Sequence, residues 1–126
     1  KMGEGISDSG LKVKIFDVNE AVRTEIIGDM LEAKGFLLGS STHYNSMLPG
    51  MAGFLDFLTC LKPKNRLAAA FGSYGGAGGA VKQIEKIAGE SGIEIAQPGI
   101  SVHFQPDGDD LRKCYEFGKD FASKLK

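Results

Sequence analysis

The stretch "LLGSSTHYNSMLPG", residues 37–50, decides how this chain folds because it changes character within a few residues. A continuously apolar run ends at Gly39, and residues 40–45 are then all polar or aromatic. A short apolar run of this kind is typical of a strand that is covered on both faces of its sheet. A loop that only joined two elements would not need so many hydrogen-bonding groups and rings, so residues 40–45 indicate a binding function.

A second loop of unusual composition follows the next apolar run. The run "LAAAF", residues 67–71, again predicts a buried strand, and "GSYGGAGG", residues 72–79, comes directly after it. Glycine makes up 18 of the 126 residues, about twice the usual ~7%, and five of these glycines lie in this loop. Glycine concentrated in one loop indicates backbone that lies close to another group. The loop matches neither the dinucleotide-binding fingerprint nor the P-loop, so it does not identify a ligand by itself.

Strand and helix patterns alternate along the rest of the chain. Leu11, Val13 and Ile15 alternate with lysines, which predicts a strand with one wetter face near an edge of the sheet. A last strand is predicted in two pieces, because "QPG" separates "IEIA" from "ISVHF". Apolar residues at helical spacing cover residues 22–33, 48–61, 81–88 and 111–125. This order predicts an α/β protein with a mainly parallel sheet.

The two unusual loops are expected to meet at one edge of that sheet. Both follow buried parallel strands, and the carboxyl ends of such strands share an edge where open α/β sheets bind their ligands. Hydroxyl groups and exposed backbone N–H groups suit a phosphate or a polar heteroaromatic edge. The rings of Tyr44 and Tyr74 can lie on either side of a planar group. The residues therefore predict a site for a phosphorylated planar cofactor.

Composition and the remaining motifs bear on the other partners and sites that the chain could have. The net charge of −1 gives no reason to expect nucleic acid or an anionic membrane as a partner. Cys60 and Cys114 lack the spacing of a metal or redox pair, so we expect two reduced thiols and a cytoplasmic chain. The run "DGDD", residues 107–110, predicts a helix N-terminal cap, and His103 is expected to be structural. The alternative for His43 is a solvated loop histidine, and no arrangement indicates a nucleophilic centre or a metal site.

At this point the two loops resemble a known family. "GSSTHYNSMLP" and "FGSYGGAGGAVKQIEK" resemble the flavodoxin-like domain of A-type flavoproteins, the flavodiiron proteins, or a free-standing flavodoxin close to them. "PDGDDLRKCYEFGK" is similar to the start of that domain's last helix, and the resemblance extends over essentially the whole chain. It implies a doubly wound parallel sheet of strand order 2-1-3-4-5 that binds FMN. Residues 1–126 would then form one flavodoxin-like domain.

The resemblance also assigns residues to the cofactor. One set matches the loop that lies along the isoalloxazine ring: Ser40, Thr42, His43, Tyr44 and Asn45. A second set matches the loop on the other side of the ring: Gly72, Ser73, Tyr74 and Gly75. The family usually has tryptophan at the position of Gly76 and often glycine at Ser46. Residues 1–9 resemble only the tail of the family's first helix. The family's first strand and its hydroxyl-rich phosphate loop are therefore expected to be missing from this chain. Without that loop, we expect the chain to bind the FMN phosphate weakly.

The function implied by the resemblance is electron transfer through bound FMN. The chain would be a free-standing flavodoxin or one domain of an oxidoreductase that reduces oxygen or nitric oxide at a di-iron centre, whose ligands this sequence lacks. Redox proteins would be its electron donor and acceptor, and a homo-oligomer is left open. One alternative is a non-redox binding or regulatory module of the same fold. The other is an NAD(P)H-dependent FMN or quinone reductase.

Overall fold

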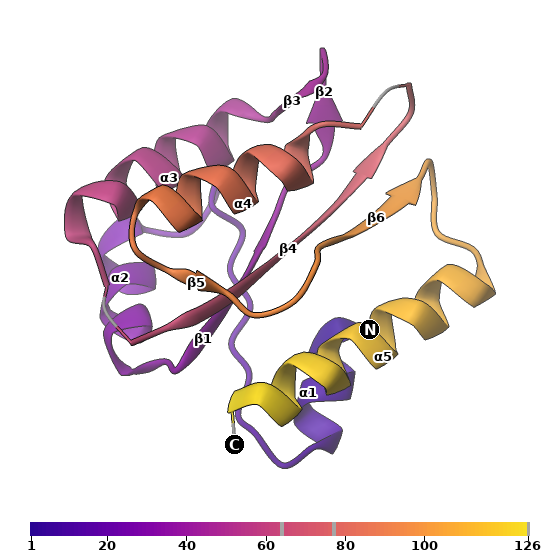
Figure 1. Ribbon diagram of the computed structural model, residues 1–126, viewed down its shortest axis with the longest axis horizontal. Coiled ribbons are helices and arrows are strands. Elements are labelled where there is room, and N and C mark those ends of the chain that lie inside the picture. Colours follow the sequence, from indigo (N-terminus) through magenta and orange to yellow (C-terminus); the bar gives the residue numbers. More distant parts are fainter. Residues whose placement is uncertain (64, 77, 126) are drawn as a thin grey trace.

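The computed structural model describes residues 1–63, 65–76 and 78–125. Figure 1 shows one sheet with helices packed on both of its faces. The elements in chain order are α1 (Met2–Asp8), α2 (Arg23–Glu32), β1 (Gly35–Gly39), β2 (Thr42–His43), β3 (Ser46–Met47), α3 (Pro49–Leu61), β4 (Leu67–Tyr74), α4 (Ala80–Glu90), β5 (Glu94–Ile95), β6 (Ile100–His103) and α5 (Gly108–Leu125). The predicted α/β class and the positions of the predicted helices are confirmed.

The sheet is built around β4, its longest strand. On one side β4 pairs in parallel with β1, from Gly35 opposite Leu67 to Gly39 opposite Phe71. On the other side β4 pairs in parallel first with β5 and then with β6. The last strand is therefore in two pieces along the same edge of β4, as the interruption at "QPG" predicts. The carboxyl ends of β1, β4 and β6 all lie at one edge of the sheet.

The apolar runs place alternate side chains on opposite faces, as strands must. Phe36, Leu38, Ala68 and Ala70 pack in one core cluster with α3 and α4. Leu37 and Ala69 belong to the other cluster, with residues of α1 and α5. Figure 1 shows the same division, with α1 and α5 on one side of the sheet and α3 and α4 on the other. Burial on both faces explains why these strands read as continuously apolar.

The strand predicted from Leu11, Val13 and Ile15 is wrong. Residues 11–17 have no regular secondary structure, and within the described chain they form no ladder with β1. Leu11 and Val13 still pack against the core beside α1 and α5, while Ile15 is 84% exposed. Alternation places side chains, but a strand also needs a neighbouring backbone to pair with, and β1 pairs only with β4 among the described strands. The five-strand order 2-1-3-4-5 therefore stays an expectation.

Helix α3 lies where the apolar spacing over residues 48–61 predicts it, and the predicted cap of α5 is confirmed. Helix α3 runs from Pro49 to Leu61, and Lys62, its C-cap, adopts a left-handed backbone conformation. Before α5, the Asp110 N–H donates to Asp107 Oδ1 at 2.8 Å and the Asp107 N–H donates to Asp110 Oδ2 at 3.1 Å. These reciprocal bonds form a capping box, so "DGDD" caps a helix as predicted.

Helices α1 and α5 are joined at their surface by a polar contact. The Tyr115 hydroxyl donates to Asp8 Oδ2 at 2.7 Å. This bond to a carboxylate is the main cause that raises the pKa of Tyr115 above its usual value.

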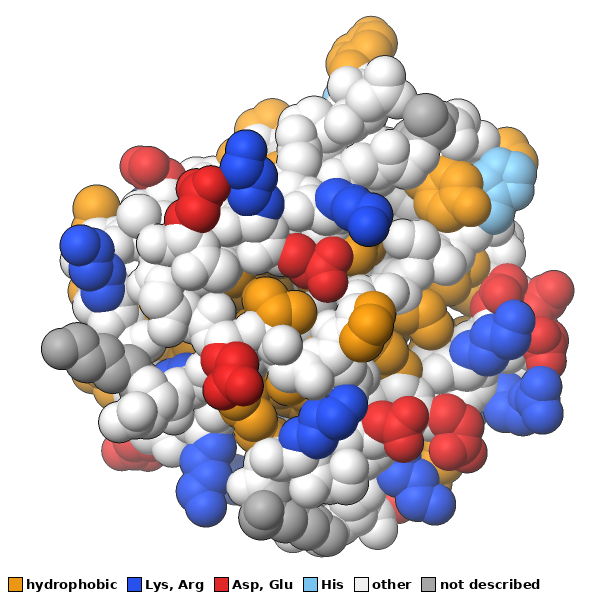
Figure 2. Space-filling view, in the orientation of Figure 1, with side chains coloured by type: hydrophobic (Ala, Val, Ile, Leu, Met, Phe, Trp, Pro, Cys, Tyr) orange, Lys and Arg blue, Asp and Glu red, His pale blue; other side chains and the backbone are white. Residues whose placement is uncertain are grey.

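Within the described ranges, no helix is long and apolar enough to cross a membrane. Figure 2 shows basic and acidic side chains interspersed over the face in view.

Candidate functional site

Residues 40–47 fold into a β-hairpin, where the sequence predicted an irregular loop. Thr42 pairs with Met47 and His43 with Ser46. The turn is made by Tyr44 and Asn45, whose φ angles are 51° and 61°. Two central residues at positive φ are typical of the type I′ turn of two-residue hairpins. Figure 1 shows this hairpin projecting from the edge of the sheet, beside the end of β4.

The turn exposes a tyrosine in an unfavourable backbone conformation. Asparagine tolerates positive φ, but a bulky residue such as Tyr44 does so only at a cost. The Tyr44 side chain is 89% exposed, and its ring lies beside the His43 ring, at 4.3 Å between centroids. Within the described residues nothing buries this ring. A strained, exposed aromatic residue is more readily explained by ligand contact than by stability.

Two of the predicted cofactor residues, Ser40 and Thr42, also hold the hairpin in place. The Ser40 hydroxyl donates to the Ser41 carbonyl at 2.8 Å and accepts from the Leu48 N–H at 2.9 Å. The Thr42 hydroxyl accepts from the Ala80 N–H at 3.2 Å, at the start of α4. Both hydroxyls bond to backbone groups in the described protein, with Ser40 donating and accepting and Thr42 accepting only. Their role here is to fix the shape of the site.

Gln83 of α4 is a further positioning residue that the sequence did not reveal. Its Oε1 accepts from the Met47 N–H at 2.8 Å and from the Ser46 hydroxyl at 3.1 Å. The hairpin is thus tied to α4 through its second strand. Gln83 follows the glycine-rich segment by a few residues, but its spacing carries no signal for a contact with residues nearly forty positions earlier.

The glycine-rich segment begins later than predicted, because β4 continues through Tyr74. Gly72, Ser73 and Tyr74 pair with the last three residues of β6. The loop proper starts at Gly75, and Ala77 lies outside the described residues. The Ser73 hydroxyl lies 3.1 Å from the Ser41 hydroxyl, so the two predicted walls touch each other. The expectation that both segments meet at one edge is confirmed.

Two glycines explain how the walls come so close. A Cβ atom at Gly72 would lie 2.3 Å from the Ser40 carbonyl oxygen, and one at Gly79 would lie 2.3 Å from the Asn45 carbonyl oxygen. Real Cβ atoms do not approach backbone oxygens this closely, so these two positions require glycine. The group that the glycine-rich segment approaches is therefore, at these positions, the hairpin itself. A Cβ at Gly76 would meet nothing within 4 Å.

The end of β6 adds a third wall with two more rings. His103 contacts the Tyr74 ring at 4.9 Å and the Phe104 ring at 4.1 Å between centroids. Its Nε2 lies 3.0 Å from the Gly75 carbonyl oxygen. Phe104 is 65% exposed. The sequence predicted a structural role for His103, and the structure places it directly beside the second loop.

The groups left over suit a planar, polar ligand. In the part of the chain that the structure describes, the side chains of His43, Tyr44, Asn45 and Tyr74 form no hydrogen bond. They offer two phenol rings, an imidazole and an amide at the edge where the walls meet. A flavin ring needs aromatic faces and an edge of donors and acceptors, so this donor set fits it.

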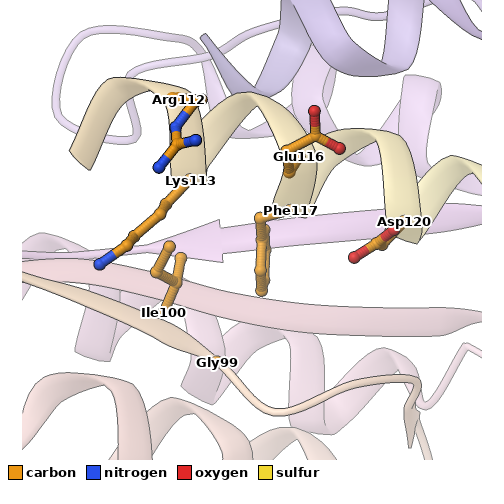
Figure 3. Close-up of a pocket in the computed structure, with 7 residues that line it drawn as sticks. All are labelled: Gly99, Ile100, Arg112, Lys113, Glu116, Phe117 and Asp120. Carbon is orange, nitrogen blue, oxygen red and sulfur yellow. The ribbon is translucent and has the colours of Figure 1, made fainter. Parts of the chain in front are cut away.

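A pocket of about 570 Å³ lies elsewhere, between β6 and α5. Figure 3 shows Ile100 and Phe117 facing each other on its floor, with Arg112 and Lys113 at its rim. Both basic side chains form ion pairs with Asp109. None of the predicted cofactor residues lines this pocket. An open hollow whose cations are already paired is a weaker candidate than the sheet edge.

The fold and the edge loops define a class, an α/β domain that binds its ligand at the carboxyl ends of parallel strands. The flavodoxin family model matches residues 1–118. The chain belongs to the flavodoxin family, whose members bind FMN. The resemblance found in the sequence is thereby confirmed.

Relatives of two kinds share this domain. The nitric oxide reductase of Moorella thermoacetica is 40% identical over 123 residues, which is 97% of this chain and 31% of that protein. The anaerobic nitric oxide reductase flavorubredoxin of Vibrio vulnificus is 41% identical over 115 residues, 91% of this chain and 23% of that protein. The chain thus spans less than a third of the length of these relatives.

Two solved structures of different kinds also match this chain. The rubredoxin oxygen:oxidoreductase of Desulfovibrio gigas superposes with a TM-score of 0.94 at 27% identity, over 98% of this chain and 31% of that one. A flavodoxin from the domain Archaea superposes with a TM-score of 0.88 at 32% identity, over 98% of this chain and 85% of that one. The domain therefore matches both a part of larger oxidoreductases and a nearly whole flavodoxin.

Proposed function

We propose that this chain carries electrons on an FMN whose ring lies between the hairpin of residues 40–47 and the segment that follows β4. The observation that supports this most is the contact of the two walls through Ser41 and Ser73, 3.1 Å apart. That contact brings the unused rings and amide to one edge of a flavodoxin-family sheet. Bound FMN supplies the redox chemistry by accepting and releasing electrons, and the protein supplies position and electrostatics.

We assign a role to each residue from the side-chain groups that make no hydrogen bond within the described protein. Tyr44 and Tyr74 stack on the ring from the two walls, since their side chains make no hydrogen bond within the described protein. The Asn45 amide and the backbone around Gly75 lie at the polar edge, where protonation of a ring nitrogen changes the hydrogen bond that is needed. His43 supports Tyr44 through their ring contact. Ser40 and Thr42 act indirectly, by holding the hairpin in shape.

These residues hold the ring and contribute little to the phosphate. The Ser40 hydroxyl already donates its proton to the Ser41 carbonyl, whereas the Thr42 hydroxyl only accepts, from the Ala80 N–H, and is the one donor of this pair left for a phosphate. Helix α1 has only seven residues and no side-chain cap at its first turn. We therefore expect the 126-residue chain to distinguish FMN only weakly from riboflavin, which lacks the phosphate.

Two settings for this domain have support. Similarity to less than a third of the named nitric oxide and oxygen reductases supports a domain that passes electrons to a metal-containing part of a larger oxidoreductase. Similarity over 85% of an archaeal flavodoxin supports a separate carrier that meets its redox partners by diffusion. In both settings the exposed ring edge near Tyr44 is the exit for electrons, and the cytoplasm is the expected compartment.

Flavin titration tests the proposal. Riboflavin added to the purified chain should lose fluorescence as it binds, and Tyr74→Ala and Asn45→Ala should each weaken binding by about tenfold, the worth of ~1.4 kcal/mol. Asn45→Ala should in addition shift the two one-electron potentials unequally. Tyr115→Phe, at the other end of the molecule, is the matched control and should bind normally. Flavin binding that is untouched by both site variants would place the ring elsewhere.

A further inference from the structure

His103 lies where the end of β6 runs beside the glycine-rich segment. It is the last residue of β6, and its backbone pairs with Tyr74, the last residue of β4. Its ring stands between two others, 4.9 Å from Tyr74 and 4.1 Å from Phe104. His103 therefore contacts both the Tyr74 ring and the Gly75 backbone, and both belong to the proposed flavin wall.

The hydrogen bond of His103 fixes the tautomer of its imidazole ring. Its Nε2 lies 3.0 Å from the Gly75 carbonyl oxygen, and a carbonyl oxygen only accepts. Nε2 must therefore carry the proton, which makes Nδ1 the unprotonated nitrogen whenever the ring is neutral. The Gly75 peptide is thereby held by a side chain from the neighbouring strand, at the point where β4 ends and the loop begins.

We propose that His103 is a positioning residue for flavin binding. Its Nε2–H fixes the orientation of the Gly75 peptide, and its ring supports Tyr74 from behind. The inference rests on the proposed function, because the segment it holds is the wall assigned to the flavin ring. It assigns no contact between His103 and the flavin itself.

Loop composition explains why such an anchor matters here. Gly75 and Gly76 lack side chains, so this part of the loop has no side chain of its own to fix its peptides, and glycine is the residue with the most backbone freedom to lose on ordering. The opposite wall has several anchors, from Gln83, Thr42 and Ser40. For the described part of the second wall, the His103 bond and the Ser41–Ser73 contact are the side-chain anchors at its start.

Three substitutions separate the two parts of the proposal. His103→Phe keeps a ring beside Tyr74 and removes the donor. His103→Gln places an amide N–H close to the position of Nε2 and removes the ring. His103→Ala removes both. Ser101→Ala is the matched control, because Ser101 is also exposed and lies two residues earlier on the same face of β6, and its side chain makes no hydrogen bond to the described part of the loop.

The first measurement uses the flavin-free protein. Nitrogen-15 NMR of the imidazole, at a pH where the ring is neutral, should show the Nε2–H tautomer. His103→Phe should move the amide resonances of Gly75 and Gly76, and His103→Gln should move them less. A Nδ1–H tautomer, or resonances that His103→Phe and Ser101→Ala shift equally little, would overturn the proposal.

The second measurement is riboflavin affinity, taken with urea unfolding of each variant. His103→Phe should weaken binding by about fivefold, the effect of losing one hydrogen bond. His103→Ala, which also removes the ring beside Tyr74, should weaken it by about tenfold, while His103→Gln should stay within about threefold of the starting chain. Equal affinity in all variants, or equal loss in His103→Gln and His103→Ala, would overturn it. If the starting chain takes up no riboflavin, the proposed function fails, and the NMR measurement still decides whether His103 holds the loop.

Discussion

The hydroxyl oxygens of Ser41 and Ser73 lie 3.1 Å apart, although the two residues are separated by 32 positions in the chain. Ser41 lies two residues after the end of β1, and Ser73 lies in the last part of β4, so this bond joins the ends of two adjacent parallel strands. It is exposed, and its net contribution to stability is therefore small. Its importance is geometric, because it sets the distance between the two walls of the proposed flavin site.

The Ser41–Ser73 bond predicts a coupling that a double-mutant cycle can measure. Ser41→Ala and Ser73→Ala should each lower the free energy of unfolding by about 0.5–1 kcal/mol, and the double variant should lose less than the sum. Urea unfolding of the four proteins gives the coupling. Ser41→Ala combined with Ser101→Ala should instead be additive, since these two side chains do not meet. Additivity in both cycles would mean that the hydroxyls do not bond in solution.

Gly79 should tolerate no side chain. A Cβ there would lie 2.3 Å from the Asn45 carbonyl oxygen, which is backbone and cannot move without shifting the turn. Gly79→Ala should cost about 1–3 kcal/mol of stability, as overpacking does, and should also weaken flavin binding. Gly76→Ala is the control, because a Cβ there meets nothing within 4 Å. Thermal unfolding that is equally unaffected in both variants would show that hairpin and loop are not in contact.

Replacing Tyr44 should raise the stability of the protein and weaken its flavin binding. Its φ of 51° disfavours a bulky residue, and its side chain is 89% exposed. Tyr44→Gly should therefore raise the free energy of unfolding, by roughly 0.5 kcal/mol once the greater backbone entropy of glycine is counted. The same variant should bind riboflavin more weakly, because it removes one ring face. A variant that loses stability and keeps its affinity would assign Tyr44 a structural role.

Tyr115 should make stability depend on alkaline pH. Its hydrogen bond to the Asp8 carboxylate raises the pKa of the phenol, so the folded state holds this proton more tightly than the unfolded state. The stabilisation is fully present below the unfolded pKa of ~10 and is lost as pH rises through the higher folded value. Urea midpoints of the starting chain and Tyr115→Phe, measured from neutral pH upward, should differ by a constant amount and converge at alkaline pH. A difference that does not change with pH would contradict the assignment.

Much of the fold could be predicted because burial leaves a direct trace in the sequence. "FLLG" and "LAAAF" read as two-sided strands since both faces of β1 and β4 are covered by helices. The order of apolar runs and polar loops then placed both unusual loops at one edge. Residues 11–15 have the alternating pattern of a strand but do not form one. The alternation of side chains does not indicate whether another strand lies beside them to pair with.

The candidate site could be predicted only in part, since its geometry depends on contacts between distant residues. The turn at Tyr44 and Asn45 lacks the glycine that usually marks a two-residue hairpin, so the hairpin was missed. Gln83 and His103 act through single bonds to the loops, and no spacing indicates such bonds. Ser40 and Thr42 are predicted at the cofactor, and the structure adds a contact that no spacing indicates, because their hydroxyls accept from the N–H groups of Leu48 and Ala80.

The central claim is that the flavin ring lies between the hairpin and the segment after β4. The most direct measurement is a titration of riboflavin into the nitrogen-15 labelled chain, followed by amide chemical shifts. The account predicts saturable shifts concentrated in residues 40–47 and 72–79 and at His103, with similar results for FMN. Shifts centred on Ile100 and Phe117, at the pocket between β6 and α5, or no saturable shifts at all, would contradict it.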